Sequence, residues 1–354
     1  MTVAERVEPT YRAYGLTVRV NREVPGLVLA PEAGPGDLRV EFVAPAGEVD
    51  PCPVGTTLDA FEGQTDRGPS MFQVCRLTAD QGGGLSLRWS LGELYVQFVI
   101  DAAVRRIVGT WAPGVAFEDT LQPLLGPVLG CVLRLRGAVC LHASVIGACV
   151  GDAGAENGPP TAAIAIVGAK FGGKSTLAAA LAHRGHALLS DDLAVLREDR
   201  GTFWVQPGLP RLLLWPSSAA VIPDMSTDDL PRIWVTPDVD KRQLILTAEP
   251  GPTPLRFHPS PLPLRAIYAL GPPDPPDTHP RVSPIAKVDA LVTVMSNTYA
   301  DYVLDRSGRV RDFEVLGRLA GHVPVRQVHR PWSLDAIPQT CTAILDDLAQ
   351  VCLE

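Results

Sequence analysis

The chain has 354 residues, of which 46% are hydrophobic and 20% charged, and it carries a formal net charge of −8. That length suggests about two domains with a sizeable core. The acidic balance argues against nucleic acid as a partner, because nucleic-acid binding needs a basic face. No uncharged apolar run is long enough to span a bilayer, so a membrane is not an expected partner either.

The cysteines give no sign of a disulfide framework. The seven of them form no Cys-x-x-Cys pair and have irregular spacings, at positions 52, 75, 131, 140, 149, 341 and 352. Their number is odd, which predicts buried free thiols in a reducing compartment. We therefore expect a cytoplasmic location.

The first part of the chain is dominated by short segments of alternating polarity, which are typical of half-buried strands. They predict a β-rich accessory domain over residues 1–115, in which no catalytic constellation is apparent. The clearest of these segments are Leu16–Val20, Leu38–Phe42, Leu85–Trp89 and Tyr95–Val99.

Residues 116–354 predict a second, α/β domain. Leucines and valines at helical spacing indicate a helix over Glu118–Leu135, with a kink expected at Pro127. A strand is expected over Leu141–Val150. Two helices are expected near the C-terminus, over Ala286–Leu304 and Ser333–Leu353.

The most informative motif of this domain is a phosphate-binding loop. The run from Gly168 to Ser175 fits Gly-x-x-x-x-Gly-Lys-[Ser/Thr], and it lies between an apolar strand, Thr161–Val167, and an alanine-rich helix, Lys174–His183. Such a motif predicts binding of a nucleoside triphosphate with Mg²⁺. The residues expected to bind it are Gly168, Ala169, Lys170, Phe171, Gly172, Gly173, Lys174, Ser175 and Thr176.

The physical basis of this expectation is the convergence of backbone N–H groups at a helix N-terminus, where the helix dipole adds positive charge. Lys174 would reach the β- and γ-phosphates, and the Ser175 hydroxyl would hold the metal. The alternative is a glycine-rich turn between a strand and a helix that binds no ligand.

Two adjacent carboxylates, Asp191 and Asp192, follow the short apolar segment that ends at Ser190. Carboxylates at the end of a strand near a phosphate loop suit phosphoryl transfer, because one can hold Mg²⁺ and the other can accept a hydroxyl proton. Neighbours on a strand point to opposite faces, so the two cannot share one role. The alternative is a helix-capping or turn aspartate.

His142 lies in the apolar segment that precedes the nucleotide strand. There it could lie beside the Asp191 carboxylate and tune its pKa. The alternative is a structural histidine.

Taken together, these residues resemble the HPr kinase/phosphorylase family. The resemblance rests on His142, on the phosphate loop and on the run from Arg184 to Asp192. Within that family the chain looks like the stand-alone kinases that phosphorylate a serine of lasso-peptide precursors. Segments such as Pro207–Pro216 and Asp240–Arg242 continue the likeness.

The resemblance implies an α/β P-loop fold of the phosphoenolpyruvate carboxykinase and HPr kinase type, with ATP and Mg²⁺ as cofactors. It implies that Asp191 is the general base, that His142 orients it and that Asp192 helps Ser175 to hold the metal. The phosphate charge would be neutralised by Lys174, Arg211, Lys241 and Arg242. The acceptor would be a serine-type hydroxyl of a peptide or small protein, and a homo-oligomer is compatible with the family.

Two departures from the family pattern matter. Phe171 stands in the loop where the family usually has a small residue, and the signature Leu-Glu-x-Arg-Gly-x-Gly is absent after Asp192. HPr itself and the phosphorylase reaction are therefore not expected. Three alternatives stay open: a small-molecule hydroxyl kinase, a regulatory module that binds nucleotide without transfer, and a plain hydrolase of nucleoside triphosphates.

Overall fold

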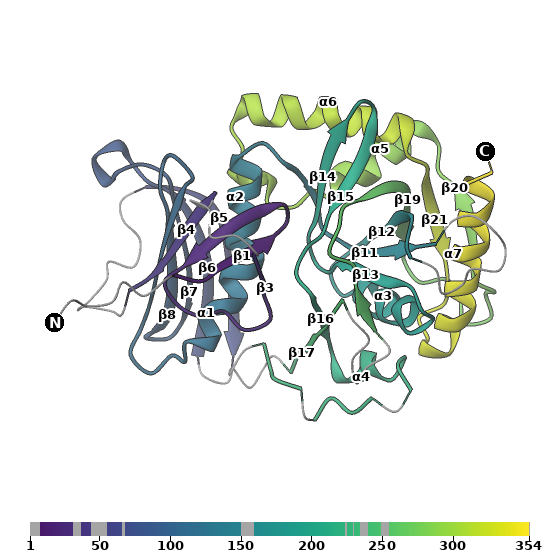
Figure 1. Cartoon of the computed structure of the whole chain (residues 1–354), viewed down its shortest axis with the longest axis horizontal. Helices are drawn as coiled ribbons and strands as arrows, with labels where there is room; N and C mark the ends of the chain where they lie inside the picture. The colour runs from purple at the N-terminus through teal and green to yellow at the C-terminus, as the bar shows by residue number, and fades with distance from the viewer. Residues whose placement is uncertain are drawn as a thin grey trace. The chain divides into compact units, whose positions relative to one another are not determined.

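The computed structural model describes residues 8–30, 37–43, 55–65, 68–149, 159–223, 225–228, 230–233, 240–248 and 255–353. The protein is mixed α/β and divides into two compact units, with the boundary between Arg136 and Gly137 (Figure 1). Unit 1 thus includes the helical segment 118–135, which the sequence-based boundary at 115/116 assigns to the second domain.

Unit 1 is built on one 9-stranded sheet. Two of the predicted strands, at 16–20 and 38–42, have the expected bounds, and the other two lie within slightly longer strands. In sheet order the strands are β3 (Val28–Leu29), β1 (Thr10–Ala13), β2 (Leu16–Val20), β4 (Leu38–Phe42), β9 (Arg106–Trp111), β8 (Leu94–Ile100), β7 (Leu85–Leu91), β6 (Gly68–Arg76) and β5 (Thr56–Thr65).

The helical segment of unit 1 follows the predicted range in three pieces. These are α1 (Glu118–Pro123), a π-helical turn (Leu124–Val128) and α2 (Leu129–Leu135). Pro127 lies inside the π turn. A proline lacks the N–H of the normal helical hydrogen bond and its ring clashes with the preceding turn, so a locally wider helix accommodates it. The irregularity expected at Pro127 is therefore confirmed, as a π-helical turn.

Unit 2 is built on a 10-stranded mixed sheet. Its main path is β10 (Val139–Leu141), β14 (Ala194–Asp199), β15 (Thr202–Gln206), β19 (Leu262–Leu270), β12 (Ala162–Gly168), β11 (Ala143–Ala148), β13 (Ala187–Ser190) and β18 (Arg256–Phe257). Off this path, β21 (Val325–His329) pairs with β19 and with β20 (Arg281–Pro284). A separate hairpin-like pair joins β16 (Arg211–Leu214) to β17 (Arg242–Ile245).

Helices cover both faces of this sheet. Ile164 and Ile166 of β12 belong to the core cluster shared with α3 (Lys174–His183) and α7 (Ile337–Val351). The alternate residues Ala163, Ala165 and Val167 belong to the cluster shared with α5 (Lys287–Ser296) and α6 (Arg306–His322). Because both faces are buried, β12 is apolar throughout instead of alternating, as its sequence suggests. The remaining helical turns are α4 (Pro216–Ala219), η1 (Ala79–Gln81), η3 (Asp301–Val303) and η4 (Leu334–Ala336).

Strand direction brings several strand ends to one edge of the sheet. β12, β19 and β21 run parallel to one another. β11 is antiparallel to both β12 and β13, so β12 and β13 share a direction. The carboxyl ends of β12, β13, β19 and β21 therefore meet at the edge where β11 begins. Ligand sites of open α/β sheets form at such an edge.

Helix α3 ends as its sequence predicts. Gly185 has φ +99° and donates its N–H to Ala182 O at 3.0 Å, while the His186 N–H reaches Leu181 O at 3.3 Å. This pair of bonds is the Schellman arrangement, which glycine favours because it has no Cβ to strain the left-handed conformation.

Three expectations for unit 2 differ from the structure. The single strand expected over 141–150 is broken at His142. Before the break β10 pairs with β14, and after it β11 pairs with β12 and β13. Residue 150 lies outside the described residues. The helix expected over 286–304 ends at Ser296. The 17-residue helix α6 was not predicted, because charged residues and glycines obscure its apolar stripe. The last expected helix is present over Ile337–Val351.

The expectation of free thiols is confirmed for the six cysteines within the described residues, of which Cys75, Cys131, Cys140 and Cys341 are buried. Cys52 lies outside the described residues. Within the described part of the chain, no helix combines the length and the apolar character that crossing a bilayer requires.

Candidate functional site

The loop between β12 and α3 has the backbone that a phosphate cradle requires. Gly168 and Gly173 have φ of +150° and +87°, which glycine tolerates, and Gly172 N–H donates to Ala169 O at 2.9 Å to close a tight turn. Gly173 is the N-cap of α3 and offers no capping side chain. The amides of the first helical turn therefore remain available to an anion, in the field of the helix dipole.

Lys174 lies across this loop. Its Nζ donates to Gly168 O at 2.9 Å and to Ala169 O at 3.1 Å, and the residue is 7% exposed. Burial lowers the pKa of Lys174, against the attraction of Asp192 and Asp191. A buried ammonium group at the base of the loop is placed to meet the charge of a bound phosphate.

Phe171 points out of the loop and not into it. Its side chain is 65% exposed, and its ring lies 6.1 Å from the ring of Trp215 in a tilted arrangement. Its φ of +65° is uncommon for a bulky residue. The ring is therefore exposed beside Trp215 and is not packed inside the loop.

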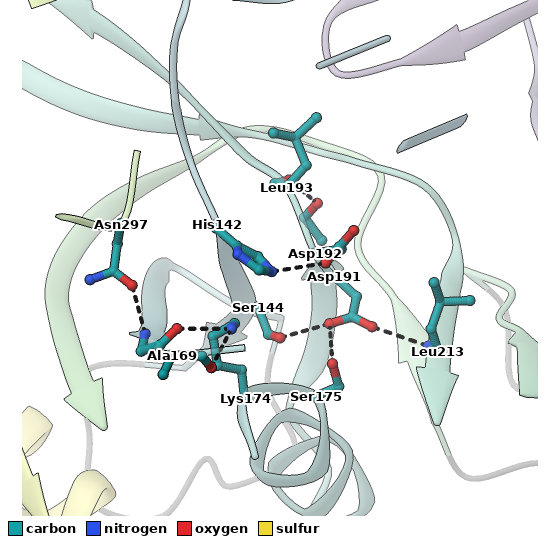
Figure 2. Close-up of polar contacts among 12 residues, drawn as sticks. His142, Ser144, Ala169, Lys174, Ser175, Asp191, Asp192, Leu193, Leu213 and Asn297 are labelled. Atoms are coloured by element: carbon teal, nitrogen blue, oxygen red, sulfur yellow. Dashed lines mark hydrogen bonds and ion pairs between the residues drawn. The ribbon is translucent and has the colours of Figure 1, made fainter. Parts of the chain in front are cut away.

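Asp191 is a buried hydrogen-bond acceptor at the end of β13, 8% exposed. Its Oδ1 accepts from Ser144 Oγ at 2.7 Å and from Ser175 Oγ at 2.9 Å, and its Oδ2 accepts the Leu213 N–H at 3.1 Å (Figure 2). These donors come from β11, α3 and β16, so the carboxylate is fixed from three sides. Because Ser175 donates its only proton to Asp191, the lone pairs of its oxygen remain free to bind a metal.

Asp192 differs sharply from its neighbour. It has φ +72°, and its side chain is 35% exposed. Its Oδ1 lies 3.1 Å from His142 Nε2 (Figure 2). Burial acts to raise the pKa of Asp192, but the His142 hydrogen bond and the charges of His142, Lys241 and Arg211 outweigh it and lower the pKa to about 2. Asp192 is thus ionised at neutral pH and reachable from solvent.

The partner of His142 is therefore Asp192 and not Asp191, which corrects the placement expected from the sequence. The physical reason is the break between β10 and β11. At that break His142 leaves the sheet ladder, and its N–H donates to Asn297 O at 2.8 Å instead. Its ring packs edge-on against Tyr299, with the ring centres 5.9 Å apart.

Asn297 is a site residue that sequence reasoning missed. Its Oδ1 accepts the Gly168 N–H at 2.9 Å, as Figure 2 shows. Its backbone carbonyl accepts the backbone N–H of His142. One residue after α5 thereby joins the start of the phosphate loop to the histidine. No motif marks Asn297 in the sequence; Ser144, the other missed residue, stands two places after His142 on β11.

Besides Lys174, the three other cations expected to neutralise phosphate charge separate into two groups. The charges of Arg211 and Lys241 act on Asp192, which places both near the carboxylates. Arg242 instead pairs with Asp240 at 2.8 Å and donates to Leu230 O at 3.0 Å. Its described contacts are therefore structural ones within the β16–β17 region.

The donor set suits Mg²⁺, although no group of three or more His, Cys, Asp or Glu side chains within the described ranges could hold a metal ion unaided. Mg²⁺ is commonly bound through one or two protein oxygens together with water and substrate phosphates. Ser175 Oγ and the Asp191 carboxylate supply such hard oxygen ligands beside the loop. Thr176, expected to bind nucleotide, directs its hydroxyl to Ser218 Oγ at 3.0 Å, so only its backbone amide can serve.

Comparisons with known proteins add little to this geometry. No family model and no curated protein matches the chain. Among solved structures, the HPr(Ser) kinase/phosphatase of Coxiella burnetii is similar, with 13% sequence identity and a TM-score of 0.27 over 60% of this chain and 97% of that one. A TM-score of this size does not establish a shared fold, so the proposal below depends on the site itself.

Proposed function

We propose that the protein is an ATP- and Mg²⁺-dependent kinase that transfers a phosphoryl group to a serine-type hydroxyl of a peptide or protein. The observation that carries the proposal is the pairing of Ser175 Oγ with Asp191 Oδ1 at 2.9 Å, at the N-terminus of a helix that follows a phosphate loop. A second carboxylate, Asp192, stands next to this pair. A protein that only binds nucleotide has no need of that second, ionised group.

The chain's own residues divide the work as follows. The first-turn amides of α3 and Lys174 hold the phosphates, and the transferring group is stabilised mainly by positioning and by positive charge. Ser175 and Asp191 would hold Mg²⁺, which would neutralise part of the phosphate charge. Arg211 and Lys241 add positive charge on the side of Asp192.

Asp192 is the group that faces the acceptor. Its carboxylate is partly exposed, ionised and oriented by His142, so it can accept the hydrogen bond of an incoming hydroxyl. It can take the hydroxyl proton as the new P–O bond forms and the bond between the γ-phosphorus and the bridging oxygen breaks, with ADP as the leaving group. Asp191 is less suited to this role, because it is 8% exposed and its oxygens already accept three protein donors. The geometry therefore favours Asp192 as the base and Asp191 on the metal side, the reverse of the roles that the family resemblance implies.

The proposal also specifies the chemical class of the phosphate acceptor. The resemblance in sequence points to the serine of a ribosomal peptide precursor of the lasso type, and the large β-rich unit 1 is compatible with an acceptor larger than a metabolite. The direct test incubates the protein with γ-labelled ATP, Mg²⁺ and a panel of peptides that end in serine, alongside small hydroxyl compounds.

The expected result is label on at least one serine peptide and its absence when Mg²⁺ is removed by chelation. Label found on small hydroxyl compounds alone would assign a metabolite kinase. Tight ATP binding with no labelled acceptor would contradict transfer and leave a nucleotide-binding module.

A further inference from the structure

Arg330 is a buried cation beside the phosphate loop. It lies outside the phosphate-loop motif and is not paired with Asp191 or Asp192. It follows β21 directly, and it is 6% exposed. β21 runs parallel to β19, which runs parallel to β12, so Arg330 lies at the same edge of the sheet as the loop.

The guanidinium of Arg330 lies against the centre of the cradle. Its Nη2 donates to Gly172 O. A Cβ added at Gly173 would lie 3.3 Å from the same Nη2, which shows how close the guanidinium is to the loop backbone just before Lys174. The exposed ring of Trp332 also lies close, with its centre 5.3 Å from the guanidinium carbon.

No carboxylate among the described residues forms an ion pair with Arg330, and its Nε has no hydrogen-bond partner within that part of the chain. Asp274, whose N–H donates to Arg330 O at 2.9 Å, directs its carboxylate to His329 at 3.7 Å. Burial lowers the pKa of Arg330 with no opposing carboxylate; an arginine nevertheless stays protonated. A buried cation without an anion is costly, and such an arrangement persists where a ligand supplies the opposite charge.

We infer that Arg330 is a second phosphate-binding cation of the nucleotide site, which contacts a phosphate of the bound nucleoside triphosphate from the side of Gly172. This inference rests on the proposed nucleotide binding. A guanidinium is suited to the task because its planar set of N–H donors can bind phosphate oxygens in pairs.

The test is titration of Mg-ATP by calorimetry into wild-type protein and Arg330→Gln, together with thermal unfolding of both proteins without ligand. A charge-assisted bond to phosphate predicts that Arg330→Gln binds Mg-ATP about tenfold to a hundredfold more weakly. Gln is shorter than Arg and gives up the bond to Gly172 O, but the substitution also removes an unpaired buried charge, so the ligand-free Tm should stay close to that of wild type. The matched control is Arg318→Gln, which removes the same charge from an exposed arginine bound to Glu198 and should bind Mg-ATP as wild type does.

Mg-ATP affinity of Arg330→Gln within twofold of wild type would overturn the inference. A loss of affinity accompanied by a lower ligand-free Tm would also overturn it, because Arg330 would then only brace the loop. If the wild-type protein itself binds no Mg-ATP, it is the proposed nucleotide function that fails.

Discussion

Unit 2 buries two polar clusters that use similar side chains but differ in what they leave available. Under α7, Tyr268 donates to Asp347 Oδ2 at 3.1 Å and to Ile344 O at 3.2 Å, and Arg326 Nε lies 3.4 Å from the same carboxylate. Burial and the nearby Asp347 raise the pKa of Tyr268, so its phenol stays protonated. The charges of this cluster are paired, because Arg326 forms an ion pair with Asp347 and the Tyr268 hydroxyl donates to the same carboxylate.

At the carboxyl edge of the sheet, the cluster around Asp191 remains open. Asp191 accepts hydrogen bonds from Ser144 and Ser175. Its neighbour Asp192 is instead 35% exposed, and the ammonium group of Lys174 donates to a loop carbonyl instead of pairing with a described carboxylate. Arg330 has no described carboxylate partner. The comparison shows that burial of polar groups alone does not mark a site. A binding site is marked by charged groups that remain available to a ligand. Substitutions in the two clusters should therefore have different effects on phosphoryl transfer and on stability.

The largest effect is expected for Asp192→Asn. Removing the group that orients the acceptor hydroxyl should lower phosphoryl transfer by about 10²–10⁴-fold. Mg-ATP affinity should stay close to that of wild type, since the proposed role of Asp192 concerns the acceptor and not the nucleotide. Initial rates with labelled ATP and calorimetric titration measure both quantities, and full transfer activity in Asp192→Asn would refute its assignment as the base.

Asp191→Asn should cost stability as well as function. The new amide group places a donor where three donors already converge, so the free energy of unfolding should fall by about 1–3 kcal/mol. Ser144→Ala is the matched control, because it removes one of the three bonds and keeps the carboxylate; its loss should be smaller. Denaturant unfolding of the three proteins measures this order, and equal stability of Asp191→Asn and wild type would contradict the hub role of Asp191.

Tyr268→Phe perturbs the cluster under α7 alone. Loss of the hydroxyl should lower the free energy of unfolding by about 0.5–1.5 kcal/mol, because Asp347 keeps Arg326. Transfer rate and Mg-ATP affinity should not change. A transfer defect in a Tyr268→Phe protein that is fully folded by circular dichroism would show that the two clusters are coupled.

The smallest effect concerns pH. The pKa of Asp192 is lowered from 3.8 to about 2, against its burial, chiefly by His142. A lowered pKa means that the ionised form is favoured at neutral pH and is lost only as the pH falls from about 4 through about 2. In His142→Gln the pKa of Asp192 should rise, so the acid limb of the pH–rate profile should move to higher pH. An unmoved acid limb would mean that His142 does not act on the base.

Local patterns in the sequence were enough to predict the pieces of the fold that depend on neighbouring residues. These include two strands of unit 1, the loop and helix α3, and the irregularity at Pro127. Helix α6 was missed because Arg, Asp and Glu dominate its sequence and its buried stripe is short. Strand β19 was missed although it lies at the centre of the sheet, since Pro263 interrupts its pattern.

The sequence was enough to predict most of the residues that form the site, but not which of them contact one another. Asp191, Asp192, Lys174, Ser175 and His142 do lie together at one edge, as their positions near strand ends suggested. Which carboxylate meets which partner depends on the order of strands β12, β11 and β13 and on the break at His142, neither of which local sequence encodes. Asn297 and Arg330 come from distant elements and carry no motif, so only the folded sheet brings them to the loop.

The division of labour between the two aspartates is the central claim, and a magnesium titration of ATP affinity tests it most directly. ATP binding would be measured by calorimetry at increasing Mg²⁺ concentration in wild type, Asp191→Asn and Asp192→Asn. If Asp191 holds the metal, Mg²⁺ should tighten ATP binding in wild type and in Asp192→Asn but not in Asp191→Asn. The reverse pattern, with the magnesium effect lost in Asp192→Asn and kept in Asp191→Asn, would contradict it.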